Sequence, residues 1–362
     1  MPAGVRDFHR GLPGFAATPL TELPGLAAEL AVSRVFVKDE SSRLGLPAFK
    51  VLGASWAVHR ALASRALASR TGAAESSVTL VTATDGNHGR AVARVARLLG
   101  QHAHVLVPDG VHPAAVAAIT AEGAEVTRVT GDYDEAVRQA AAAAAGPATL
   151  LIQDTAWPGY EQIPGWIVAG YGTLCAEIDE QLAAAGAGPP DLVGVPVGVG
   201  SLAQAVVTHY RSRTRPAGTA PAVLAVEPEA ACWVVASLTR GEPVSVATGQ
   251  TIMAGLNCGT PSSLAWPCLR DGLDAAVTVT DAESARAVAD LAAAGVSAGP
   301  CGAAALAGLR TALTGDGAGQ RRAELGLHRG ATVVLLSTEG TAANPHVPPG
   351  GLSRVRDWPA AR

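Results

Sequence analysis

Short apolar runs alternate along the chain with longer alanine-rich stretches whose apolar positions recur every three or four residues. In the stretch 88–99, for example, Val92, Val95, Ala96 and Leu99 fall on one face of a helix. The short runs predict strands at residues 35–38, 78–83, 104–108, 125–129, 149–152, 192–197, 223–227, 277–280 and 332–337. Strands that alternate with helices predict an α/β fold whose parallel sheets are covered on both faces.

Residues at the ends of several predicted helices support this pattern. Asp132, with Glu135 three positions later, is typical of an N-cap acid at a helix start. Gly123, Gly295 and Gly315 each follow a helical run and predict where it ends.

Composition and charge exclude several classes of protein. The 362 residues are 48% hydrophobic and 16% charged with a net charge of −4, so a globular chain without nucleic-acid partners is expected. No apolar run reaches the roughly 20 residues of a membrane span, and the N-terminus lacks the apolar core of a secretory signal. The five cysteines form no CxxC pair, which favours a reducing cytoplasmic setting, and the nine histidines show no metal-binding spacing, so no metal is expected.

Lysine is rare in this chain. Of the 27 basic residues only Lys38 and Lys50 are lysine, which leaves 27 − 2 = 25 arginines. Arginine stays charged and cannot act as an amine nucleophile near neutral pH. The two lysines are therefore candidates for amine chemistry, although chance or packing would also explain their positions.

Lys50 lies in an apolar context, Phe49-Lys50-Val51-Leu52, before a helix expected from Gly53 onward. The positive end of a helix dipole disfavours a charged amine. A neutral amine is what a Schiff base requires. A solvated surface lysine is the alternative, which the apolar neighbours oppose.

A polar turn, TDGNHG, separates the strand 78–83 from the helix 88–99. Free N–H groups at a helix start suit a substrate carboxylate, or they form an ordinary capped turn. An acid at Asp85 opposes anion binding unless the substrate also carries a cation or Asp85 handles a proton.

A glycine-rich turn, Gly198-Val199-Gly200-Ser201-Leu202, follows the apolar strand 192–197. Such a turn binds phosphate through backbone N–H groups. The run GVGSLA also matches a dinucleotide fingerprint, with Glu227 at the end of the next strand. A bound phosphate is common to both interpretations.

Two further polar clusters follow strands, where α/β sheets bind ligands. They are Gln153-Asp154-Thr155 after the strand 149–152, and Ser337-Thr338-Glu339 after the strand 332–337. Cys301 begins a helix and is expected to be a small buried side chain rather than a catalytic thiol.

In this order the motifs resemble the fold-type II, or tryptophan-synthase β-like, pyridoxal-phosphate (PLP) enzymes, and within them the diaminopropionate ammonia-lyases. The resemblance covers nearly the whole chain. It is most specific in ATDGNHGRAVA (83–93), QDTAWPGYEQIPGWIVAGY (153–171) and TIMAGLNCGTPSSLAWP (251–267). It departs from the expected pattern at Cys301, Pro158 and Ser263. The first two lie in ligand-facing motifs, so a relative of 2,3-diaminopropionate, used in specialised biosynthesis, is an alternative substrate.

The resemblance implies a role for each motif. Lys50 would bind PLP covalently, and Asp154 would hold the β-ammonium of the substrate. The other implied cofactor contacts are Phe49, Asn87 at the PLP 3-hydroxyl, Gly198, Val199, Gly200, Ser201 and Leu202 at the phosphate, and Ser337 or Thr338 at the pyridine nitrogen. The N–H groups of Thr84, Asp85, Gly86, Asn87 and His88 would bind the substrate carboxylate.

Asp85 is the discriminating position. Threonine deaminases usually carry a small neutral residue there, whereas the resemblance implies that Asp85 takes the Cα proton of a D-substrate and Lys50 that of an L-substrate. The expected reaction is the elimination of ammonia from 2,3-diaminopropionate to give pyruvate and ammonia.

Three alternatives differ in the residues they use. A β-replacement or serine/threonine dehydratase would not need Asp85. An NAD-dependent dehydrogenase using Gly198–Ala203 would leave Lys50 and TDGNHG without a role. A non-catalytic binding protein would have no need to keep Lys50, Asp85 and Asp154.

The resemblance also implies an organisation. A smaller domain is expected at 46–148, within a larger PLP-binding domain formed by 1–45 and 149–362, with PLP in the cleft between them. A cytoplasmic homodimer in amino-acid metabolism is expected from the family alone.

Overall fold

The computed structural model describes residues 4–68, 77–212 and 220–343. Its strands are β1 Leu20–Glu22, β2 Arg34–Asp39, β3 Thr79–Ala83, β4 His102–Pro108, β5 Glu125–Val129, β6 Thr149–Leu151, β7 Leu192–Pro196, β8 Ala222–Pro228, β9 Ala275–Val279 and β10 Thr332–Ser337. Its α-helices are α1 Val5–Arg10, α2 Pro24–Glu29, α3 Val51–Ala68, α4 Asn87–Leu98, α5 Pro113–Ala121, α6 Tyr133–Ala143, α7 Gln162–Ala184, α8 Ser201–Ser212, α9 Trp233–Arg240, α10 Ala265–Gly272, α11 Asp281–Ala293, α12 Pro300–Leu313 and α13 Ala318–Glu324. Three 3-10 turns, Glu229–Ala231, Ala254–Leu256 and Thr341–Ala343, complete the elements.

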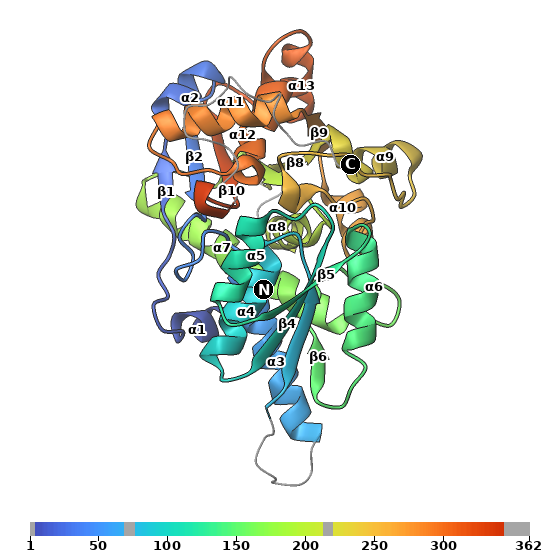
Figure 1. Cartoon of the computed structure of the whole chain (residues 1–362). Coiled ribbons are helices and arrows are strands. Elements are labelled where there is room, and N and C mark those ends of the chain that lie inside the picture. The colour runs from blue at the N-terminus through green and yellow to red at the C-terminus, as the bar shows by residue number, and fades with distance from the viewer. Residues whose placement is uncertain (1–3, 69–76, 213–219, 344–362) are drawn as a thin grey trace.

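The strands form two sheets, one in each lobe of the molecule (Figure 1). The larger sheet has the order β1-β2-β10-β7-β8-β9, and the smaller has the order β5-β4-β3-β6. Every pairing is parallel except that of β1 with β2. The predicted α/β class with parallel sheets is therefore confirmed.

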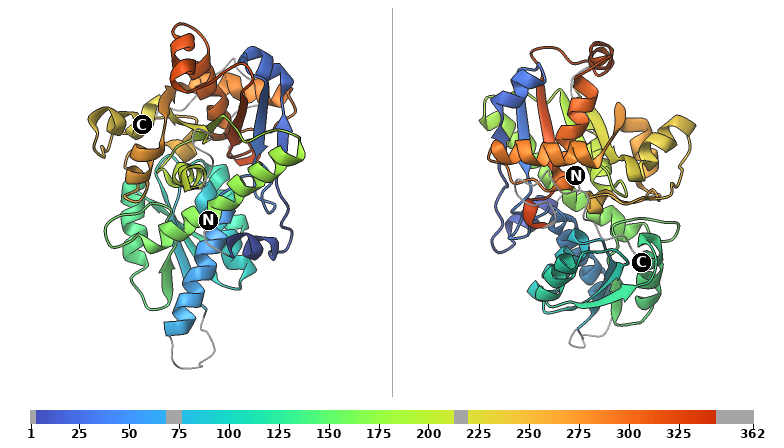
Figure 2. Two further views of the ribbon diagram at one scale, coloured as in Figure 1. Left: turned by 180° about the vertical axis from the view of Figure 1, so that it is seen from behind. Right: turned by 45° about the horizontal axis from the view of Figure 1, so that its top comes forward.

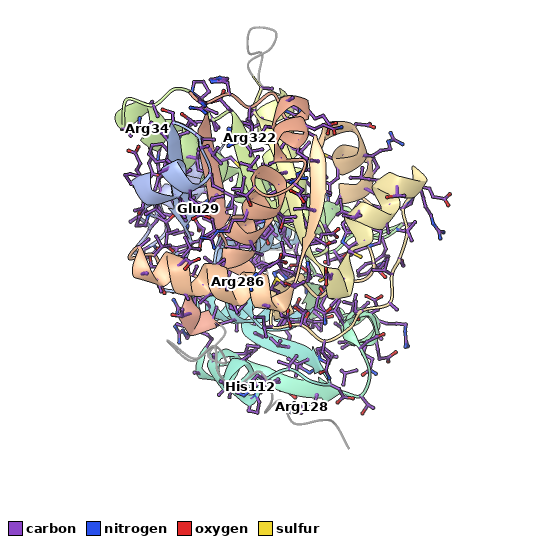
Figure 3. All side chains as sticks on the ribbon, turned by 90° about the horizontal axis from the view of Figure 1, so that it is seen from above. Glu29, Arg34, His112, Arg128, Arg286 and Arg322 are labelled. Carbon is purple, nitrogen blue, oxygen red and sulfur yellow. The ribbon has the colours of Figure 1, made fainter. Side chains whose placement is uncertain are left out.

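Helices cover both faces of the larger sheet. Apolar side chains of α2, α11 and α12 pack on one face, and those of α7, α8 and α10 pack on the other. The rear view shows the long α7 crossing between the lobes (Figure 2). Ion pairs such as Glu29–Arg310 and Glu22–Arg34 lie on the outer surface, where Figure 3 labels Glu29 and Arg34.

The predicted helix ends also form as expected. The Asp132 side chain accepts a hydrogen bond from Glu135 N at 2.9 Å and begins α6. Gly123, Gly295 and Gly315 have φ of 93°, 82° and 71°, in the left-handed region that suits glycine just beyond a helix.

All nine predicted strands are present, with ends that differ by up to two residues, and β1 was not predicted. The division at 46–148 stays a prediction. Because β6 pairs with β3, we propose that the smaller unit continues through Leu151.

Helices α3 and α7 cross closely beside the start of α3. A Cβ at Gly53 would lie 2.5 Å from Tyr171 Cε1, and one at Gly170 would lie 2.5 Å from Leu52 O. Both distances are too short for any side chain. The two glycines therefore permit the approach that fixes the first turn of α3, directly after Lys50.

Lys38 is fully buried in an ion-pair network. Its Nζ donates to Glu177 Oε2 at 2.7 Å, to Gln181 Oε1 at 2.8 Å and to Thr18 O at 2.7 Å. Arg43 pairs with the same Glu177. All three ammonium donors of Lys38 are used to join β2 to α7, so packing explains this lysine.

Across the part of the chain that is described, the structure contains no helix both long and apolar enough to cross a membrane.

Candidate active site

A pocket lies between the two lobes, at the carboxyl ends of several parallel strands. Its walls come from the segments that follow β3, β6, β7 and β10, together with the start of α3 and the turn at 255–258. This is the place where open parallel sheets bind ligands.

The pocket brings together the predicted site residues with one exception. Its lining includes Phe49, Lys50, Thr84, Asp85, Gly86, Asn87, His88, Asp154, Gly198, Val199, Gly200, Ser201, Leu202 and Thr338. Ser337 is absent from the lining. Its hydroxyl is buried behind the wall, where a Cβ on Gly302 would lie 2.8 Å from Ser337 Oγ. Thr338 is therefore the better placed of the two hydroxyl candidates.

Lys50 immediately precedes α3, which begins at Val51 rather than at the expected Gly53. The loop that carries Lys50 is held against the end of β10, because Phe49 N donates to Thr338 O and Gly340 N donates to Pro47 O. Lys50 Nζ donates to Asp154 Oδ2 at 2.6 Å. The sequence thus places the amine at the end of a fixed loop, facing an acid 104 positions away.

The ion pair with Asp154 decides the charge of Lys50. Burial alone would lower the pKa of Lys50, but Asp154, together with Tyr171 and Cys258, outweighs burial and raises it. The expectation that the helix start favours a neutral amine is wrong for this structure, because a carboxylate at hydrogen-bond distance acts more strongly than the dipole.

Asp154 is the anion of the pocket. Burial opposes its charge, yet His88 and Lys50 lower its pKa to about 2. His88 Nε2 contacts Ile152 O at 2.7 Å, which assigns the ring proton to Nε2. Burial lowers the pKa of His88, although the Asp154 carboxylate acts in the opposite direction. Asp154 is therefore a carboxylate set to bind an ammonium group.

Asp85 behaves differently from Asp154 in the same pocket. Burial and the nearby Asp154 carboxylate raise the pKa of Asp85 to about 7, although Lys50 acts in the opposite direction. A carboxyl with this pKa can exchange a proton near neutral pH. Two acids whose pKa values are pushed apart in this way are typical of separate catalytic roles.

Some backbone N–H groups of the turn at 84–88 already have hydrogen-bond acceptors within the protein. Thr84 N donates to Leu106 O, and Thr84 Oγ1 accepts hydrogen bonds from Gly86 N and Gly89 N. The N–H groups of Asp85, Asn87 and His88 find no acceptor among the described residues. Of the five N–H groups predicted to bind the substrate carboxylate, three therefore remain available.

The glycine-rich turn forms a backbone cradle at the start of α8. A Cβ at Gly198 would lie 2.9 Å from Gly255 O. Gly200 has φ of 101°, and a Cβ there would lie 2.7 Å from Ala265 Cβ. Any larger residue would clash, so glycine is required for this turn, which lines the pocket at the N-terminus of α8, where the free N–H groups of a first helical turn suit a phosphate.

Sequence reasoning missed two polar residues of the pocket. Tyr133 begins α6, and its hydroxyl accepts from Gln153 Nε2 at 2.8 Å and donates to Asp154 Oδ1 at 3.4 Å. Glu339 follows β10, and its Oε2 accepts from Asn87 Nδ2 at 2.5 Å. Tyr133 directly follows the predicted N-cap Asp132, and Glu339 belongs to the polar cluster after the strand 332–337, but neither was predicted as a site residue.

Comparisons with known proteins agree with this geometry. Residues 12–339 match the family model described as pyridoxal-phosphate dependent enzyme. The diaminopropionate ammonia-lyase of Salmonella typhimurium is 40% identical over 298 residues, 78% of this chain and 73% of that protein. The Escherichia coli K12 enzyme of the same name is 34% identical over 359 residues, 94% of this chain and 89% of that protein.

A solved structure supports the same relationship. It is the Escherichia coli diaminopropionate ammonia lyase in complex with an aminoacrylate-PLP azomethine reaction intermediate. The two structures agree with a TM-score of 0.85 at 34% identity, over 95% of this chain and 89% of that one.

Proposed function

The chain belongs to the pyridoxal-phosphate-dependent enzymes and, among them, to the diaminopropionate ammonia-lyases, and on that premise we propose that it eliminates ammonia from 2,3-diaminopropionate. One substrate and one water give pyruvate and two molecules of ammonia. The observation that carries this proposal is the contact of Lys50 Nζ with Asp154 Oδ2 at 2.6 Å, in a pocket that also holds Asp85.

The pocket fits pyridoxal phosphate. The Gly198–Leu202 turn supplies a backbone cradle for its phosphate, Lys50 supplies an amine, and Asn87 and Thr338 supply polar groups for the ring. When bound, this cofactor supplies an electron-accepting ring that stabilises negative charge at the substrate Cα. Phe49 lies beside Lys50 in the lining and offers an apolar face.

We assign the proton transfers to two residues. Lys50 Nζ takes the Cα proton of the L-isomer as a neutral amine, once the substrate β-ammonium has replaced it at Asp154, and Asp85 takes the Cα proton of the D-isomer. The Asp85 pKa of about 7 supports this role, because the carboxyl group can then exchange a proton near neutral pH.

Asp154 and the turn at 84–88 orient the substrate. A carboxylate that binds the Lys50 ammonium is chemically suited to the β-ammonium of the substrate. The N–H groups of Asp85, Asn87 and His88 would bind the α-carboxylate. These two contacts require both an acid and an ammonium on a short substrate, which favours a diamino acid over serine or threonine.

The pH dependence tests the Asp85 assignment. Asp85 accepts a proton only when it is deprotonated, so kcat/KM for the D-isomer should rise with pH up to about pH 7 and then level off. Below that pH it should fall about tenfold per unit. Pyruvate formation from each isomer, measured from pH 5 to pH 9, gives both profiles. Identical profiles would contradict the assignment, and pyruvate from neither isomer would overturn the proposed function.

We also propose a cytoplasmic homodimer. All five cysteines are unpaired, which supports a reducing compartment. An apolar groove lies beside α1, α3 and α4, and the exposed side chains Leu67, Leu98 and Leu99 lie on α3 and at the end of α4. Apolar surface gathered in one place is typical of a protein contact.

A further inference from the structure

Glu339 occupies a junction of three segments at the pocket wall. Its side chain is only 3% exposed, although it carries a carboxyl group. Oε2 accepts from Asn87 Nδ2 at 2.5 Å, across the gap between the lobes, and Oε1 accepts from Cys301 N at 3.2 Å at the start of α12. The backbone of Glu339 pairs with Ala48, two residues before Lys50.

Each carboxylate oxygen therefore has a donor as its partner. The N–H of Cys301 can only donate, so Oε1 must accept. The N-terminus of α12 also favours a negative charge at this position. Burial raises the pKa of Glu339, whereas the hydrogen bonds from Cys301 and Asn87 act in the opposite direction and favour the ionised form. Both contacts therefore fit a carboxylate that accepts at both oxygens.

This requirement fixes the orientation of the Asn87 amide. An asparagine amide can turn its oxygen or its nitrogen toward a neighbour, and only hydrogen-bond partners decide between the two. An acceptor at Glu339 Oε2 selects the nitrogen. Nδ2 carries two N–H groups, so one remains for an acceptor in the pocket that Asn87 lines.

We propose that Glu339 is a positioning residue that holds the Asn87 amide with its remaining N–H available to the 3-oxygen of pyridoxal phosphate. This inference rests on the proposed function and on the role assigned to Asn87 there. Glu339 itself does not touch the cofactor in this account and acts through Asn87.

The sharpest test is Glu339→Gln, which keeps the size of the side chain. The Cys301 N–H holds the glutamine oxygen, so the glutamine NH₂ group faces Asn87. The Asn87 amide then has to turn its oxygen toward that group, and its nitrogen leaves the orientation we propose. A merely structural side chain would tolerate glutamine well.

The readouts are the visible absorbance maximum of the holoenzyme and the dissociation constant of pyridoxal phosphate. Glu339→Gln and Glu339→Ala should each shift the band and weaken cofactor binding roughly tenfold, the size expected for one charge-assisted hydrogen bond. Asn87→Ala should show the same change. The double variant Asn87→Ala/Glu339→Gln should be no worse than Asn87→Ala alone, because Glu339 acts only through Asn87.

Three results would overturn the inference. They are a wild-type band and affinity in Glu339→Gln, additive effects in the double variant, or an unchanged cofactor affinity in Asn87→Ala. Thermal unfolding of the cofactor-free proteins identifies variants that fail to fold. If Glu339→Ala fails to fold, Glu339→Gln is the deciding variant. A wild-type protein without any cofactor band would instead refute the proposed function, so the two failures are distinguishable.

Discussion

Lys50→Ala is expected to abolish the visible band of the lysine-bound cofactor and to slow ammonia release from either isomer by about 10⁴-fold or more. The chain has one other lysine, and all three donors of Lys38 are bound within the protein. Lys38 is therefore not available to replace Lys50. The absorbance spectrum after reconstitution with pyridoxal phosphate and the rate of pyruvate formation measure the two effects.

Lys38→Met is the matched control for Lys50→Ala. It removes the other lysine but leaves Glu177 paired with Arg43. We expect this variant to keep the cofactor band and to lose about 3 kcal/mol of unfolding free energy, as for a broken buried ion pair. Loss of the band in Lys38→Met, with the fold retained, would show that Lys50 is not the lysine that binds the cofactor.

Asp85→Asn is expected to slow turnover of the D-isomer by roughly 10²- to 10⁴-fold, the usual contribution of a general base. Turnover of the L-isomer should change by no more than about threefold, because Lys50 takes that proton and the asparagine keeps the shape of the side chain. Steady-state kcat/KM for the two purified isomers gives the ratio directly.

Asp134→Asn provides the matched control for charge. Asp134 acts on Asp85 only through its field and donates no proton in this account, since its side chain accepts from Thr260 Oγ1 at 2.7 Å. We expect the ratio of D- to L-isomer turnover to stay unchanged in Asp134→Asn. An equal loss for both isomers in Asp85→Asn would refute the assignment of two separate bases.

The sequence predicted the sheets well because their signal is local. Runs of four to six residues between helical stretches mark the parallel strands, and nine of these were located within two residues at each end. Strand β1 escaped because it has three residues, is the antiparallel edge strand and is not buried. Such a strand carries no apolar run to recognise.

The sequence predicted which motifs form the site, but it did not predict the charges of the residues there. Strand ends show which turns meet at one edge of a sheet, and this is enough to gather Asp85 and Asp154, which follow β3 and β6. Lys50 precedes α3, and only the family resemblance placed it in the same site. The charge of Lys50 depends on its 2.6 Å contact with Asp154, which a helix-dipole argument on neighbouring residues cannot include. Glu339 was missed for the same reason, because its partners Asn87 and Cys301 are distant in sequence.

The most direct test is the spectrum of the purified protein with pyridoxal phosphate, before and after addition of D,L-2,3-diaminopropionate, with pyruvate measured in parallel. We expect a visible cofactor band that changes on addition of the substrate, and pyruvate that accumulates with ammonia. A protein without such a band would contradict the cofactor, and a band without pyruvate would contradict the substrate.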